Sequence, residues 1–221
     1  VVVCGRLGWT ADPERQPLVN EPDASYGGAI WGKVGPEVTG ANVSFAVRAR
    51  GTVLRDLGAA LSPDNAFGII QGLETVALRM KQHCSNASKV VDYLKKNKEV
   101  TRVIYPTEHE GKIADRAKKY LNEGNGGLVG IELKGGIEAG KRFIESLKMF
   151  YHVANIGDAR SLAIHPATTT HSQLTEKELL ASGVTPGYVR LCIGIEHIDD
   201  IIEDLDQALN KSSKGNLKAV S

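Results

Sequence analysis

The chain has 221 residues, of which 42% are hydrophobic, and its 27 basic residues nearly balance 26 acidic ones, giving a formal net charge of +1. This balance, without a long basic run that includes aromatic side chains, argues against nucleic acid or an anionic membrane as the main partner. No apolar run approaches the roughly 20 residues that span a bilayer. Composition therefore predicts a soluble globular protein.

The three cysteines, Cys4, Cys84 and Cys192, are odd in number and widely spaced. This pattern is more typical of reduced thiols in a cytoplasmic protein than of a disulfide framework. The absence of Cys-x-x-Cys and of histidine pairs at i, i+4 predicts no metal site. The chain starts at Val1 without an initiator methionine or a signal peptide, so we expect a fragment of a longer protein.

The first 60 residues predict little regular structure before a helix. Residues 1–4 indicate the end of a buried strand. Residues 7–40, rich in Gly and Pro, predict a long irregular arm, and the aromatic residues Trp9, Tyr26 and Trp31 favour an ordered arm over a disordered one. Such an arm packs on another element or subunit, or is a simple surface excursion. Residues 43–54 have helical spacing, with Gly58 as the C-terminal cap.

A long helix is predicted from Ser62, Pro63 and Asp64, which form a strong helix start, to about residue 97. One helix of that length can link two domains, which we place at residues 1–70 and 71–221. Strands at 100–105, 128–133, 150–154 and 188–193 alternate with helices at 112–121, 137–149 and 197–210, and a capping box, Thr175 to Glu178, starts a short helix. This order predicts an α/β or α+β layer with helices covering one sheet.

In the last helix, spacing predicts a buried side and a hydrated side. The buried residues are Ile198, Ile201, Ile202, Leu205 and Leu209, and the acidic residues expected to face water are Asp199, Asp200, Glu203, Asp204 and Asp206.

Arg190 is the strongest candidate for chemistry, because it lies inside an otherwise apolar strand. Alternation places Tyr188, Arg190 and Cys192 on one face. A covered guanidinium keeps its charge and needs a carboxylate or a phosphate, and its forked donors match a carboxylate. An exposed or structurally paired arginine is the alternative.

Asn155 and Ser161, separated by Gly157, could donate hydrogen bonds to the same anion, although a loop asparagine more often caps its own backbone. The residues around Thr170, between His165 and His171, match no metal, nucleotide or serine-hydrolase motif. The residues alone therefore indicate only a candidate anion-binding site.

Several ordered motifs point to one family. Residues 61–67 (LSPDNAF), 161–172 (SLAIHPATTTHS) and 189–196 (VRLCIGIE) resemble the C-terminal half of the cysteine/methionine-metabolism family of pyridoxal-phosphate (PLP) enzymes. Within that family, residues 21–26 (EPDASY), 54–58 (LRDLG), 72–75 (GLET) and 155–161 (NIGDARS) are most similar to the O-acetylhomoserine sulfhydrylases. The cystathionine and methionine lyases usually have a shorter arm and a serine at the position of Asn155.

The resemblance implies a fold-type I PLP-dependent transferase, with the end of the large cofactor domain in residues 1–70 and the small C-terminal domain in 71–221, assembled as a homotetramer. The implied reaction replaces the acetate of O-acetylhomoserine by sulfide and gives homocysteine. Arg190 would hold the substrate's α-carboxylate and Asn155 would assist. Ser161, Thr170 and Arg55 would be candidates for the pocket wall.

No lysine of this chain occupies the family's Schiff-base motif, which is expected upstream of Val1, so no catalytic residue is assigned here and the N-terminal half of the enzyme is an expected partner. Cystathionine γ-synthase and methionine γ-lyase are the alternatives within the family. A non-catalytic amino-acid-binding or interaction domain is the alternative from another class.

Overall fold

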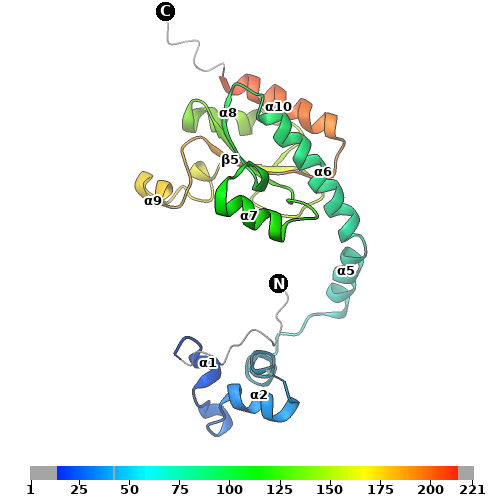
Figure 1. The fold of residues 1–221 in the computed structure, drawn as a ribbon, viewed down its shortest axis with the longest axis vertical. Helices are drawn as coiled ribbons and strands as arrows, with labels where there is room; N and C mark the ends of the chain where they lie inside the picture. The colour runs from blue at the N-terminus through cyan, green and yellow to red at the C-terminus, as the bar shows by residue number, and fades with distance from the viewer. Residues whose placement is uncertain (1–13, 42, 214–221) are drawn as a thin grey trace, which may run out of the picture. The chain divides into compact units, whose positions relative to one another are not determined.

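The computed structural model describes residues 14–41 and 43–213, and the chain divides into two compact units, Val1–Ile70 and Gln71–Ser221 (Figure 1). The predicted strand at residues 1–4 lies outside the described residues. The assignment of the first unit to the end of a cofactor domain stays a prediction.

The first unit is helical. Its elements are α1 (Pro17–Asn20), the 3-10 turn η1 (Ala24–Tyr26), α2 (Trp31–Thr39), α3 (Ser44–Arg48), the π-helical segment η2 (Ala49–Leu54) and α4 (Arg55–Leu57). The helix predicted at 43–54 is confirmed and continues three residues further. It ends at Gly58, whose φ of 66° lies in the left-handed region that glycine adopts without strain.

The prediction of an irregular arm over residues 7–40 is wrong for the residues that the structure describes, because α2 forms there despite Pro36. A Cβ on Gly35 would lie 2.9 Å from Ser44 Oγ, so this glycine lets α2 approach α3 closely. The buried Trp31 donates a hydrogen bond from Nε1 to Asp23 Oδ2 at 2.8 Å. Tertiary packing therefore outweighs the low helix propensity, and the aromatic side chains order the arm.

The prediction of a single long helix from Ser62 is also wrong. The start is confirmed, because the Asn65 N–H donates to Ser62 Oγ at 3.2 Å. The helical segment is nevertheless interrupted at Thr75, whose φ of -109° and ψ of 2° leave the helical range, and it forms α5 (Pro63–Glu74) and α6 (Val76–Leu94).

The second unit contains a five-stranded sheet with the strand order β1-β2-β5-β4-β3. Only β3 and β4 pair in parallel. In chain order its elements after α6 are β1 (Val100–Ile104), η3 (Pro106–Glu108), α7 (Gly111–Tyr120), β2 (Leu128–Leu133), α8 (Gly136–Ser146), β3 (Tyr151–His152), β4 (Leu162–Ile164), η4 (Pro166–Thr168), α9 (Glu176–Ala181), β5 (Tyr188–Cys192) and α10 (Ile198–Ser213). The predicted layer of helices on one sheet is confirmed, and β4 is the strand that was not predicted.

One face of the sheet forms the core. Helices α6, α8 and α10 cover it, and Figure 1 shows α8 and α10 on the side of the sheet opposite α7. Its fully buried side chains include Ile131 and Leu191 from the sheet and Leu94, Phe143 and Leu205 from the helices. None of the helices in the described part of the chain is both long and apolar enough to cross a membrane.

Asp204 of α10 was expected to face water, and this expectation is wrong. Its side chain is only 6% exposed. The carboxylate accepts hydrogen bonds from the N–H groups of Lys148, Met149 and Phe150 at 2.8 to 3.2 Å. Helical spacing could not reveal this role, because the turn that Asp204 caps lies more than fifty residues away in the sequence.

Candidate functional site

The second face of the sheet carries the candidate site. Val189 and Leu191 of β5 point into the core, whereas Tyr188 and Arg190 are only partly buried, as the predicted alternation requires. Arg190 pairs with Gly130 of β2 and with Ile164 of β4. A Cβ on Gly130 would come within 2.8 Å of the Tyr188 ring, so this glycine makes room for an aromatic side chain beside the arginine.

The charge of Arg190 has no acidic partner within the described part of the chain. None of the ion pairs formed among residues 14–41 and 43–213 includes it. Its Nη2 donates to the main-chain oxygen of Asn155 at 3.1 Å, and its buried Nε has no hydrogen-bond partner among these residues. A guanidinium held in this way keeps donors for an anion, which carboxylate groups match in geometry.

Asn155 lies next to Arg190, but its contact is made by the main chain. Its carbonyl oxygen accepts from both Arg190 Nη2 and Cys192 Sγ, each at 3.1 Å. Its side-chain Oδ1 accepts from the Ile156 N–H at 2.9 Å, which is the local capping that a loop asparagine favours. Burial raises the pKa of the Cys192 thiol, so this sulfur stays a protonated donor.

Ser161 is fully buried, and its hydrogen bonds go to Glu196. The Ser161 N–H and Oγ donate to the two carboxylate oxygens at 2.6 and 2.9 Å, and Ser161 Oγ accepts from the Gly194 N–H at 2.9 Å. A Cβ on Gly194 would lie 2.5 Å from Ser161 N, so only glycine fits there. This network ties the end of β5 to the loop that contains Asn155.

Thr170 is exposed, and its Oγ1 lies 2.8 Å from His171 Nδ1. Within the described part of the chain, no hydrogen bond joins Thr170 to Arg190 or Asn155. The neighbouring His165 is buried between Thr168 Oγ1 at 2.8 Å and the Pro186 carbonyl at 2.9 Å. Burial lowers the pKa of His165, so it is neutral, with Nε2 donating to Pro186.

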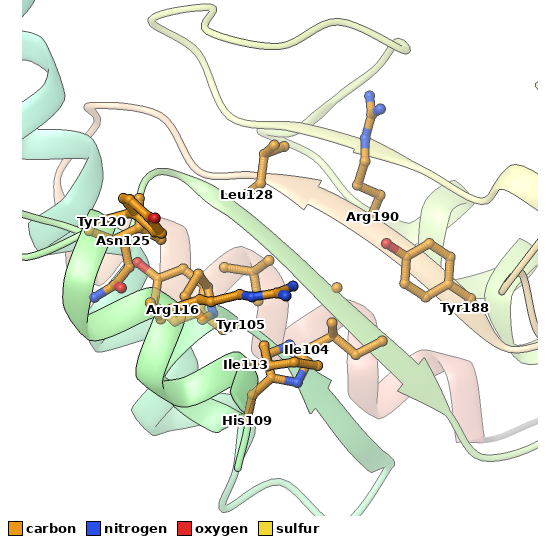
Figure 2. A pocket seen from close by; sticks show the side chains of 15 residues that line it. Ile104, Tyr105, His109, Ile113, Arg116, Tyr120, Asn125, Leu128, Tyr188 and Arg190 are labelled. Carbon is orange, nitrogen blue, oxygen red and sulfur yellow. The ribbon is translucent and has the colours of Figure 1, made fainter. Parts of the chain in front are cut away.

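A cavity of about 630 Å³ lies between α7 and the Arg190 face, and we call it the Arg190 cavity. Figure 2 shows Arg116, Ile113 and His109 on one side and Arg190 and Tyr188 on the other. Burial raises the pKa of Tyr188, which keeps its hydroxyl protonated. The cavity therefore combines an apolar lining with cationic groups, which suits a small anionic molecule.

Sequence reasoning missed two residues that build the site, because Glu196 was seen only as part of a motif and Gly130 gave no signal. Cys192 was expected as a reduced thiol, and the structure shows it as a buried free cysteine whose Sγ donates to the Asn155 carbonyl. Glu196 could have been suspected from its place directly after an apolar strand, because a carboxylate there needs donors. The partners of Cys192 and Glu196 lie more than thirty residues away and could not be identified from spacing.

Comparison with known proteins identifies relatives. Residues 27–210 match the family model described as Cys/Met metabolism PLP-dependent enzyme. An O-acetyl-L-homoserine sulfhydrylase of Leptospira meyeri is 51% identical over 194 residues, covering 86% of this chain and 44% of the relative. An L-methionine gamma-lyase of Fusobacterium nucleatum subsp. polymorphum is 42% identical over 171 residues, covering 77% of this chain and 43% of the relative.

A solved structure agrees with these matches. The crystal structure of a putative O-acetylhomoserine (thiol)-lyase from Campylobacter jejuni, which carries a pyridoxyl-lysine phosphate, superposes with a TM-score of 0.74 at 40% identity and covers 89% of this chain and 45% of that one. The chain thus spans about half the length of the proteins it matches. These matches confirm the predicted family and its fold, and the chain belongs to the Cys/Met metabolism family of PLP-dependent enzymes.

Proposed function

We propose that this chain is part of an O-acetylhomoserine sulfhydrylase, which replaces the acetate of O-acetylhomoserine by sulfide and releases homocysteine. The observation that carries the proposal is Arg190, a partly buried cation that is oriented by a carbonyl and has no acidic partner in the described part of the chain. The names of the similar proteins support the choice of substrate.

In this proposal Arg190 binds the α-carboxylate of the amino acid through two parallel N–H donors. The Asn155 carbonyl fixes the orientation of the guanidinium, and the Asn155 side chain lies at the same edge of the site. Ser161 and Thr170 stay candidates for the pocket wall. Because the carboxylate is held at a fixed point, the rest of the substrate is oriented for reaction before chemistry begins.

The residues that line the Arg190 cavity are better suited to binding the substrate's carboxylate than to binding PLP. No lysine lines the Arg190 cavity, so this part of the protein offers no amine to hold PLP there. We propose that the Schiff-base lysine belongs to the other half of the enzyme, upstream of this chain. PLP withdraws electrons from the substrate, and the protein supplies orientation.

Further partners are part of the same proposal. No residue of α5 is buried, and the apolar side chains of Phe67 and Leu73 on it are 65% and 61% exposed. Apolar side chains on one helix are usually covered by another chain segment or subunit. This supports the N-terminal half of the enzyme and a homotetramer as partners, and we place the enzyme in the cytoplasm.

The reaction is tested by supplying the complete enzyme with O-acetylhomoserine and different acceptors. With sulfide, we expect homocysteine as the dominant product, measured by mass spectrometry. Dominant cystathionine with cysteine would instead support a cystathionine γ-synthase. Dominant 2-oxobutyrate in the absence of an acceptor would support a γ-lyase, the activity named for one of the relatives.

A non-catalytic amino-acid-binding domain is tested separately. Calorimetry on the chain alone, without cofactor, would support it by showing tight binding of amino acids. We expect no tight binding, because the Arg190 site provides only the carboxylate side of the pocket.

A further inference from the structure

A second and smaller cavity adjoins the Asn155 loop and contains a buried histidine. The cavity has a volume of about 230 Å³, and we call it the His83 pocket. His83 of α6 is 4% exposed, and its Nε2 is buried without a hydrogen-bond partner among the described residues. A buried ring nitrogen without a hydrogen-bond partner destabilises the folded protein unless a bound molecule supplies the missing hydrogen bond.

The hydrogen bond on the other side of the ring sets the role of Nε2. His83 Nδ1 lies 2.7 Å from the carbonyl oxygen of Ile193. A carbonyl only accepts, so Nδ1 carries the proton, and this tautomer follows from the hydrogen-bond partners. In this tautomer Nε2 presents a lone pair to the pocket. An occupant must therefore donate a hydrogen bond.

The other residues that line the pocket favour a small, neutral and polarizable molecule. The lining includes two sulfur-containing residues, Met80 and Cys192, and the apolar residue Ile156. Asp158 also lines the pocket, and its carboxylate is engaged by the Arg160 N–H at 3.0 Å. The same carboxylate is also paired with Arg160 Nε at 3.5 Å, and no lysine or arginine among the described residues lines the pocket, so the pocket offers no cation to an anion and suits an uncharged donor.

The pocket lies beside the Arg190 site. Cys192 Sγ and Arg190 Nη2 are each 3.1 Å from the same oxygen of Asn155, so these two atoms lie within about twice that distance of each other. Residues Ile156, Gly157 and Asp158, which directly follow Asn155, also line the pocket. A molecule in it would therefore be close to a substrate whose carboxylate is bound by Arg190.

We propose that the His83 pocket binds the sulfur nucleophile of the reaction as neutral hydrogen sulfide or a small thiol, whose S–H donates to His83 Nε2. This inference rests on the proposed sulfhydrylase function, since it gives the second substrate its own subsite. His83 is a binding residue for that substrate, whereas Arg190 binds the amino acid.

The test replaces His83 by Asn in the complete enzyme. The Asn side-chain amide can still donate to the Ile193 carbonyl but does not reach the position of Nε2. We expect KM for sulfide to rise about tenfold, the effect of one lost hydrogen bond, while KM for O-acetylhomoserine stays unchanged. His152→Asn, an exposed histidine of β3 that lines neither cavity, is the matched control and should leave KM for sulfide unchanged.

A second measurement does not depend on turnover. In the ¹⁵N-histidine NMR spectrum of the complete enzyme, methanethiol without O-acetylhomoserine should shift the His83 Nε2 resonance, which is assigned by its loss in His83→Asn. An unshifted resonance, or an unchanged sulfide KM in a variant that still makes homocysteine, would overturn the His83 inference. Wild-type enzyme that makes no homocysteine would overturn the proposed function instead, and the NMR titration would then decide on the pocket alone.

Discussion

Arg190 is oriented by a main-chain oxygen, and this choice of partner has a functional consequence. A carboxylate at the same place would neutralise the guanidinium and occupy its paired donors. The Asn155 carbonyl takes one donor and leaves the positive charge available. In the proposed function, binding of the substrate carboxylate would offset the cost of holding this partly buried cation.

His165 gives a prediction about pH at the scale of one residue. Burial lowers its pKa below the ordinary value of 6.5, so the unfolded chain binds a proton more readily than the folded chain. The stability that neutral His165 contributes is fully present above about pH 6.5 and is lost as pH falls from there towards its folded pKa.

The measurement compares wild type with His165→Gln, whose amide can still donate to the Pro186 carbonyl. In urea unfolding between pH 8 and pH 5, we expect the difference in unfolding free energy between the two proteins to shrink as pH falls. A difference that stays constant across this range would show that His165 is not buried as a neutral side chain.

The sequence predicted the key pair of the site but not the chemistry of their contact. Arg190 and Asn155 were expected together, one as the main cation and the other as an assisting donor. The structure joins them through a backbone carbonyl, which no side-chain pattern encodes. His83 was counted only within a helical segment, because its partner Ile193 is 110 residues away.

Among the elements, α10 gives the clearest test of packing. The Asp204 carboxylate satisfies three main-chain N–H groups in the turn between α8 and β3. Asp204→Ala should leave these donors without partners and lower the unfolding free energy by about 3 kcal/mol.

Urea denaturation of the variant measures this loss. Glu203→Ala is the control, because it removes an exposed acid from the interior of the same helix and should change stability by less than about 0.5 kcal/mol. Equal effects of the two substitutions would contradict the capping role of Asp204.

Elements with strong local signals were predictable. The β-branched content of residues 100–105 predicted β1, the partly alternating pattern of residues 128–133 predicted β2, and the capping box of Thr175 predicted the start of α9. Strand β4 has only three residues and is fixed by pairing with β5, so it has too little length for a pattern. Helix α2 was missed because Gly35 allows close packing against α3, whereas glycine and proline in the sequence alone indicate a loop.

At the scale of the whole molecule, the second unit is a sheet covered by helices on its core face and carrying a cationic site on the other. The chain spans about half the length of the relatives it matches. In the proposed function, residues 71–213 form the substrate-binding side of the active site, and the other half of the enzyme provides the Schiff-base lysine.

The proposed role of Arg190 is tested most directly by the kinetics of Arg190→Ala in the complete enzyme. The control is Arg102→Ala, which changes an exposed arginine of the same sheet. We expect kcat/KM for O-acetylhomoserine to fall by about 10- to 150-fold, corresponding to about 1.5–3 kcal/mol for a charged hydrogen-bonded contact. The loss should vanish for an analogue that lacks the α-carboxylate. Wild-type kinetics in Arg190→Ala, or an equal loss with the analogue, would contradict the assignment of Arg190 as the carboxylate-binding residue.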